Sequence, residues 1–157
     1  MAELIDNPVY PFTTFSFAVE IYRGEDGSPL VNAAFAECDG LEMNLEVKTI
    51  REGGSNDRQI RFNGAVGYGQ LTLKRGMTAN FDLWKWFQDS VHDPRLRAGV
   101  EVVLLAPGSE TERARFQMSR CVPVKIKAPQ LNAKDGQIAI EELQIAYETL
   151  QLALPQA

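Results

Sequence analysis

The sequence predicts a mainly β protein, an antiparallel β-sandwich or barrel with one flanking α-helix. Three observations predict this fold class. Several segments alternate apolar and polar residues with the period of two that belongs to β-strands. Clusters of Gly, Asn, Asp and Pro separate these segments. One stretch, residues 78–91, instead repeats apolar residues with the period of a helix.

Composition bounds the class of protein. The 157 residues are enough for a single domain with one core. A net charge of −5 argues against a surface built for nucleic acid, which needs concentrated Lys and Arg. No apolar run approaches the ~20 residues of a membrane span, and acidic residues stand where a signal peptide carries positive charge. We therefore expect cytoplasmic assembly, no membrane insertion and no specific nucleic-acid binding.

The N-terminal third predicts an arm and two strands. Residues 1–11 form an irregular arm because two prolines interrupt backbone hydrogen bonding. Alternation over residues 15–21 predicts a first strand, and residues 24–29 form a turn cluster. A second strand is expected at residues 35–39, after which Gly40 permits a bend or bulge.

The longest alternating segment opens a long β-hairpin over residues 40–76. Its apolar side is Leu41, Met43, Leu45, Val47 and Thr49, and its polar side is Glu42, Asn44, Glu46 and Lys48. Eleven extended residues cover roughly 36 Å, whereas a globule of this length has a radius of gyration of about 15 Å. The hairpin therefore crosses the domain or protrudes from it. A protruding two-stranded ribbon needs partners, which indicates an assembly protein.

A polar loop joins the two halves of this hairpin. It is Arg51, Glu52, Gly53, Gly54, Ser55, Asn56, Asp57 and Arg58, a set rich in flexible and left-handed positions. The return strand begins with Ile60 and Phe62 and resumes at Leu71 and Leu73, after several glycines interrupt it.

Residues 78–91 are the expected helix. Phe81, Trp84, Phe87 and Val91 would form its apolar stripe, and Asp93–Pro94 follows its end. Trp86 lies off this stripe. We expect it either to be exposed as an interface residue or to pack under the N-terminal arm.

Further strands are expected at residues 100–105, 112–124 and 137–152. In the last of these, the apolar phase shifts by one residue at Glu141–Glu142, which predicts a bulge. Cys38 and Cys121 are far apart in sequence. Free thiols in a reducing compartment are favoured over a bridge.

The sequence offers little for catalysis. His92, the single histidine, stands at a helix end, where the macrodipole favours a solvated imidazole. Two distant cysteines and one histidine cannot form a plausible zinc site. Adjacent Glu141 and Glu142 would point to opposite faces, so solvation or inter-subunit pairing is favoured. Lys74–Arg75 is either a basic contact or a solvated strand end. We expect no catalytic, cofactor-binding or metal-binding residues, and no enzyme.

Five motifs in order carry a family resemblance. They are FAVEI at 17–21, FAECDGLE at 35–42, IREGGSN at 50–56, LTLKRG at 71–76 and DLWKW at 82–86, and IEELQIAYE at 140–148 also fits. This chain resembles the inner tube proteins of phage-tail-like contractile injection systems, which are related to contractile-phage tail tubes. The resemblance covers roughly residues 12–152.

The resemblance implies a hexameric ring whose subunits pool strands into one β-barrel around a lumen. Rings would stack into a rigid tube, with a sheath around it, a baseplate hub and spike below, and a cap or terminator. Cargo would pass through the lumen, and the particle would be released or would inject its tube. No cofactor is implied.

The resemblance also assigns roles to residues. Glu42, Asn44, Glu46 and Lys48 would line the lumen because a wide barrel needs a polar interior, while Leu41, Met43, Leu45 and Val47 would pack outward onto the helix and second sheet. The loop 51–58 would reach a neighbouring subunit or ring. Trp86, on the outer flank, would be available to the sheath.

Two features depart from a minimal tube subunit. The arm and the 23–34 segment are longer, and Tyr147 stands in the last strand where the family often has His. These departures leave open a tube-initiator ring between baseplate hub and tube. A type VI secretion tube protein is another alternative. From a different class, a small monomeric β-barrel ligand binder or enzyme also remains open.

Overall fold

The computed structural model describes residues 16–24, 27–32, 34–51, 53 and 59–153. Its helix is α1 (Asp82–His92), and its strands are β1 (Phe17–Arg23), β2 (Ser28–Asn32), β3 (Glu37–Asp39), β4 (Met43–Arg51), β5 (Gln59–Tyr68), β6 (Gln70–Gly76), β7 (Ala98–Leu105), β8 (Glu112–Lys127), β9 (Ile140–Ala146) and β10 (Thr149–Ala153). The chain is mainly antiparallel β with one helix among the described residues, as predicted.

Eight strands form one antiparallel sheet system that curls into a body. Its order is β2-β1-β7-β8-β9-β6-β3, and β10 pairs with β8 beside this path. The long strand β8 joins the two halves, pairing with β7 and β10 in its first part and with β9 in its second. Arg120 lies close to this change of partner and has a φ of 51°, a left-handed value.

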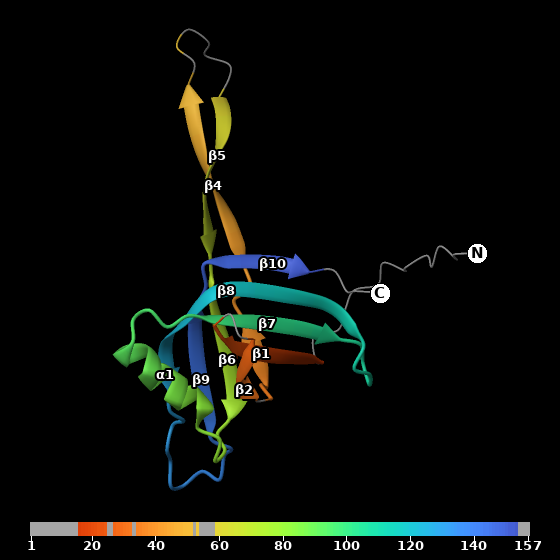
Figure 1. Cartoon of the computed structure of the whole chain (residues 1–157), viewed down its shortest axis with the longest axis vertical. Helices are drawn as coiled ribbons and strands as arrows, with labels where there is room; N and C mark the ends of the chain where they lie inside the picture. Colours follow the sequence, from red (N-terminus) through yellow and green to blue (C-terminus); the bar gives the residue numbers. More distant parts are fainter. Residues whose placement is uncertain (1–15, 25–26, 33, 52, 54–58, 154–157) are drawn as a thin grey trace, which may run out of the picture.

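The remaining two strands, β4 and β5, form a separate two-stranded sheet, here called the ribbon. Figure 1 shows the ribbon projecting from the body at the top of the long axis. The long alternating segment therefore protrudes, which was one of the two outcomes that its length predicted.

The core lies between the curled strands and α1, which packs on β8 and β2 (Figure 1). It draws mainly on Val19 and Ile21 of β1, Leu71 and Leu73 of β6, Val100 and Val102 of β7, and Leu143 and Ile145 of β9. These residues alternate in each strand with exposed or half-buried ones, so one side of each strand is buried, as the period-two pattern requires.

The helix differs from its prediction in both start and buried face. It begins at Asp82, and Phe81 and Val91 are 58% and 66% exposed. Leu83 and Trp86, three residues apart on one face, are each 1% exposed. Of the two expectations for Trp86, exposure is therefore wrong, and packing under the N-terminal arm stays a prediction because the arm lies outside the described residues. A short helix places only one narrow stripe against the body, and here that stripe starts at Leu83.

The C-terminal strands differ as well. The predicted strand 137–152 is two strands, β9 and β10, which pair with different parts of β8. The bulge predicted at Glu141–Glu142 is wrong, because the β6–β9 register is continuous there. The β8–β9 irregularity lies instead between Pro123 and Lys125. The strand β2 was not predicted, because its first residues fall in the turn cluster 24–29.

Candidate assembly surfaces

The ribbon is anchored to the body at Gly40. This residue has a φ of +95°, and a Cβ built there would lie 1.9 Å from the carbonyl oxygen of Gln70. Only glycine fits such a position without a backbone shift. The chain therefore passes from β3 into β4 through the bend that the sequence predicted at this glycine.

Tyr147 stabilises the bend at Gly40 through hydrogen bonds. Its buried hydroxyl donates to the Gly40 carbonyl at 2.8 Å, with the Glu42 carbonyl as a second acceptor at 3.0 Å. It also accepts from the Glu42 N–H at 3.2 Å. Its ring packs on Tyr68, with centroids 5.7 Å apart. The base of the ribbon is thereby held from the end of β9.

The polar side of β4 matches the prediction in its geometry. Glu42, Asn44, Glu46 and Lys48 are all exposed and alternate along one side of the strand. Their neighbours include glycines of β5 and of the link to β6: a Cβ on Gly67 would lie 2.3 Å from Asn44 Oδ1, and one on Gly69, between β5 and β6, would lie 2.5 Å from the Cγ of Glu42. The glycines that interrupt the return strand thus make room for the polar side chains of β4.

The apolar side of the ribbon has no cover in the described chain. Met43, Leu45 and Val47 are 63%, 47% and 54% exposed, and Val66 beside them is 49% exposed. Within the single chain these β4 residues do not pack on the helix or the second sheet, and of the four expected residues Leu41, at the base, packs against the core. Their outward packing in a ring stays a prediction. Exposed apolar side chains in a row mark a surface meant for a partner.

The loop 51–58 lies almost entirely outside the described residues, as does the N-terminal arm. Of the eight loop residues, the backbone of Arg51 and residue Gly53 are described. The predicted contact of this loop with a neighbour therefore stays a prediction.

A buried ion pair ties the second half of the body to the helix. Arg75 and Glu141 are 3% and 2% exposed, and the Arg75 Nε donates to Glu141 Oε1. The guanidinium also donates to the Asn80 carbonyl at 2.9 Å, and Trp84 Nε1 donates to Glu141 Oε2 at 2.9 Å. Every charge here has hydrogen-bonding partners, which makes burial of the pair tolerable.

This pair corrects two sequence interpretations. Arg75 is neither a solvated strand end nor a surface contact, and Glu141 pairs within its own chain rather than with solvent or another subunit. A signal was present: Arg75 is in phase with Leu71 and Leu73, and Glu141 is in phase with Leu143 and Ile145. Opposite charges in two adjacent apolar rows indicate a buried pair.

Strands β1, β7 and β8 carry a partly buried network around Arg115. This guanidinium donates to Glu20, Glu101 and Glu112, and the Arg115 side chain holds the pKa of the Glu112 carboxyl below its usual range. Burial and the neighbouring Glu20 raise the pKa of Tyr22 to about 12. The carboxylates and the guanidinium are one another's hydrogen-bonding partners, so we interpret the network as stabilising the strands that carry it.

The described residues offer little for chemistry. They include no group of three or more His, Cys, Asp or Glu side chains placed to hold a metal ion. Cys38 and Cys121 are unbridged. No helix in the described ranges is long and apolar enough to cross a membrane. What the geometry presents is a ribbon whose apolar side is uncovered in the described chain.

The fold and this ribbon together define a β-rich assembly subunit, a protein built to be completed by neighbours. Comparison with known families gives the particular one. The chain matches the family described as T4-like virus tail tube protein gp19 over residues 13–151. It belongs to this family and is a structural subunit of a tail tube.

Solved structures agree with the assignment. A chain of the anti-feeding prophage (AFP) baseplate, six-fold symmetrised, is 27% identical, with a TM-score of 0.79 over 92% of this chain and 96% of that one. A chain of the sheath–tube complex of PVC, an extracellular contractile injection system, is 17% identical, with a TM-score of 0.77 over 94% of each chain. A chain of the AFP tube-terminating cap is 16% identical, with a TM-score of 0.76 over 98% and 99%. The last two show likeness of fold. No curated protein matched.

Proposed function

We propose that copies of this chain close into a hexameric ring in which the ribbons stand side by side as one β-barrel. The observation that carries the proposal is the ribbon itself. Within the described chain, β4 and β5 pair only with each other, so each has an unpaired edge, and their apolar side is uncovered. If the ribbons of neighbouring copies pair edge to edge in one barrel, the strand edges gain hydrogen-bond partners and the apolar side is covered. The six-fold symmetry of the similar AFP structure supports six copies.

In this ring, the polar side of the ribbon lines the lumen. Glu42, Asn44, Glu46 and Lys48 would face the water-filled channel, and Met43, Leu45 and Val47 would be covered by neighbouring subunits. Over Glu42, Asn44 and Glu46, the barrel then has the arrangement that a wide aqueous channel needs, polar within and apolar toward protein. The loop 51–58 would contact a neighbouring subunit or ring. The tube acts as a stiff conduit and piston, and bond chemistry forms no part of the proposed role.

The proposed partners follow from the structures that this fold resembles. The similar chains come from a sheath–tube complex, a baseplate and a tube-terminating cap. We infer that this subunit stacks on other rings inside a sheath, between a baseplate with its hub and spike and a cap, and that cargo occupies the lumen. Because Trp86 is buried, we do not assign it to the sheath contact.

A second candidate is a ring at the baseplate end of the tube. Identity to the AFP baseplate chain is 27%, against 17% and 16% for the sheath–tube and cap chains. Copy number separates the candidates: a main tube protein is present in many rings per particle, and an initiator in one. Quantitative mass spectrometry of purified particles would give that number directly.

Two variants on adjacent ribbon positions test the ring. Leu45→Asp places a charge on the apolar side, and since Leu45 is 47% exposed in the single chain, the subunit should still fold. We expect it to remain monomeric by light scattering, because a charge cannot be buried at the subunit contact. The matched control, Glu46→Lys, changes the lumen side and should still form rings. Equal assembly of both variants would contradict the proposed faces, and a wild-type chain that never assembles would contradict the ring.

A further inference from the structure

Four strands of the body form a group that we call the wall sheet. They lie in the order β3-β6-β9-β8, where β8 contributes only its second part, residues 122–127, and every pairing among them is antiparallel. Strands β6 and β9 run along the long axis of the molecule, as the ribbon does (Figure 1). One side of the wall sheet packs against the core through Cys38, Leu73, Leu143 and Ile126. Since side chains alternate, the residues between these point away from the core.

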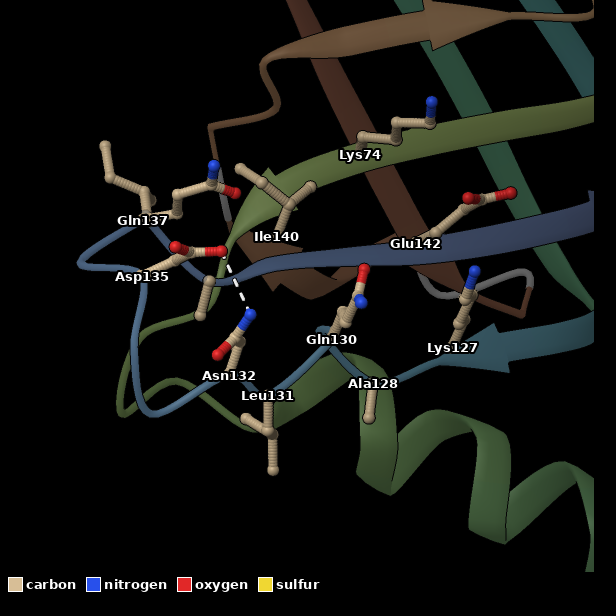
Figure 2. A pocket seen from close by; sticks show the side chains of 12 residues that line it. Lys74, Lys127, Ala128, Gln130, Leu131, Asn132, Asp135, Gln137, Ile140 and Glu142 are labelled. Atoms are coloured by element: carbon tan, nitrogen blue, oxygen red, sulfur yellow. Dashed lines mark hydrogen bonds between the residues drawn. The ribbon is translucent and has the colours of Figure 1, made fainter.

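The side of the wall sheet that points away from the core carries two rows of polar residues, one residue from each strand. The register of the first row places side by side Glu37, Lys74, Glu142 and Lys127. The register of the second row places side by side Asp39, Thr72, Gln144 and Lys125. Figure 2 shows Lys74, Glu142 and Lys127 pointing to the same side of their three strands. Lys74 Nζ lies 3.4 Å from Glu37 Oε2, so opposite charges already meet across strands within one copy.

Both rows begin with an acid at one edge of the wall sheet and end with a lysine at the other. Glu37 and Asp39 belong to β3, whose strand partner among the described residues is β6 alone. Lys125 and Lys127 belong to the part of β8 beyond Cys121, where the described chain offers β9 as the only partner. All four charged side chains are exposed. We call Glu37 and Asp39 the acidic edge, and Lys125 and Lys127 the basic edge.

We propose that the basic edge of one copy pairs with the acidic edge of the next copy around the ring. This inference rests on the proposed ring. Two unlike edges make a head-to-tail contact, which closes into a ring when the rotation between copies closes. The strand directions agree with it, because β8 runs opposite to β3 across four alternating strands. A copy rotated about an axis along the strands therefore presents its β3 antiparallel to β8, and both open edges gain hydrogen-bond partners.

Charge selects which edges meet. In the unstaggered register, Lys127 would stand beside Glu37 of the next copy and Lys125 beside Asp39 of the next copy, where opposite charges stabilise a cross-strand pair. Closure of a barrel tilts and staggers its strands. Because both charges of each edge lie two residues apart on one side, a stagger of two residues in either direction still joins one lysine to one acid. Two acidic or two basic edges would place like charges opposite each other, so the pairing sets the direction of the ring contact.

Two charge-reversed variants test this contact. Lys125→Glu with Lys127→Glu makes both edges acidic, and Glu37→Lys with Asp39→Lys makes both edges basic. Each variant alone should give a ring fraction at least about tenfold below that of the wild type, because like charges would face each other at every contact. Native mass spectrometry measures the ring fraction, and denaturant unfolding checks that each variant folds.

Mixing the two variants in equal amounts should restore rings. An acidic edge then meets a basic edge wherever the two variants alternate, and a six-fold ring has room for strict alternation. The mass of the restored ring should correspond to three copies of each variant. The matched control is Lys85→Glu with Lys134→Glu, which changes the net charge as the first variant does but alters exposed lysines on neither edge. This control should form rings by itself.

The outcomes separate this inference from the ring itself. Wild-type ring fractions from either edge variant alone, or no mixed rings from two folded variants, would overturn the pairing of the edges and leave the ring standing. If either double variant fails to fold, the single reversals Lys127→Glu and Glu37→Lys, mixed in the same way, are judged by the same outcomes. A wild-type chain that forms no rings would overturn the ring on which the inference rests.

Discussion

The hydroxyl of Tyr147 lies 2.8 Å from the carbonyl oxygen of Gly40, residues 107 positions apart in sequence. This hydrogen bond joins the end of β9 to the point where the ribbon leaves the body. Within the described chain, Met43, Leu45 and Val47 on the apolar side of the ribbon are exposed. The direction of the ribbon therefore depends on the contacts at its base, where Tyr147 bonds to Gly40. A subunit that must present a long ribbon to its neighbours needs such a fixed origin.

Removing the hydroxyl should weaken that base measurably. Tyr147→Phe leaves the Glu42 N–H without its acceptor and should lower the free energy of unfolding by about 1–3 kcal/mol. Denaturant unfolding measures the loss, and amide exchange at Glu42 and Met43 should accelerate. The control is Tyr68→Phe, which alters the aromatic side chain that packs on Tyr147, and it should lower the free energy of unfolding by less. Equal effects of the two variants would show that the hydroxyl does not fasten the bend.

The bend should tolerate no side chain at Gly40. Gly40→Ala must relieve a contact of 1.9 Å with a backbone oxygen at a left-handed φ, and we expect a loss of at least about 2 kcal/mol. Gly136→Ala is the matched control, because a Cβ there meets nothing within 4 Å. Thermal unfolding of the two variants gives the comparison. Near-equal melting temperatures would mean that the bend is not as tight as described.

The buried pair of Arg75 and Glu141 should behave unlike the surface pairs. Arg75→Met leaves Glu141 buried without its partner and should cost about 3–5 kcal/mol. The double variant Arg75→Met with Glu141→Leu should recover most of this loss. Arg120→Met, which breaks an exposed pair with Glu148, should cost about 1 kcal/mol or less. A double variant no more stable than Arg75→Met would argue against a purely pairwise origin of the cost.

Alkaline pH should destabilise the subunit through its thiols. Burial raises the pKa of Cys38 from its ordinary 9.0 to about 11, so the folded chain holds a proton that the unfolded chain releases. The stabilisation is full below pH 9 and is lost as the pH rises toward 11. Unfolding at several pH values should show this decline, and Cys38→Ala should make it shallower. An unchanged slope in the variant would assign the decline to other groups.

Much of the fold follows from local pattern, because alternation along a strand is a property of the strand itself. The protruding ribbon follows from the length of one alternating segment, and the bend at Gly40 from a single residue. The buried face of the helix could not be predicted in the same way. Whether Trp84 or Trp86 is buried depends on where the helix starts, and its first residue is Asp82. Propensity places such a boundary only within a few residues.

The missed features all depend on how distant segments pair. The ribbon has a bulge opposite Glu46, because Leu45 pairs with Val66 but Val47 pairs with Asn63. This bulge arises from the register between β4 and β5, which a loop separates, so neither strand reveals it alone. The pair of Arg75 and Glu141 requires β6 and β9 to be neighbours. In both cases tertiary contact decides which side of a strand a residue occupies, and period-two reasoning within one strand cannot.

The central claim is that ribbons of neighbouring copies form one barrel with the side of Glu42, Asn44 and Glu46 toward a lumen. Cryo-electron microscopy of assembled wild-type protein tests it most directly. The predicted result is a six-fold ring in which the edges of β4 and β5 pair with strands of adjacent copies and these three side chains face the channel. Density for a ring with Met43 and Leu45 facing the channel, or a protein that stays monomeric and unpaired at every concentration, would contradict it.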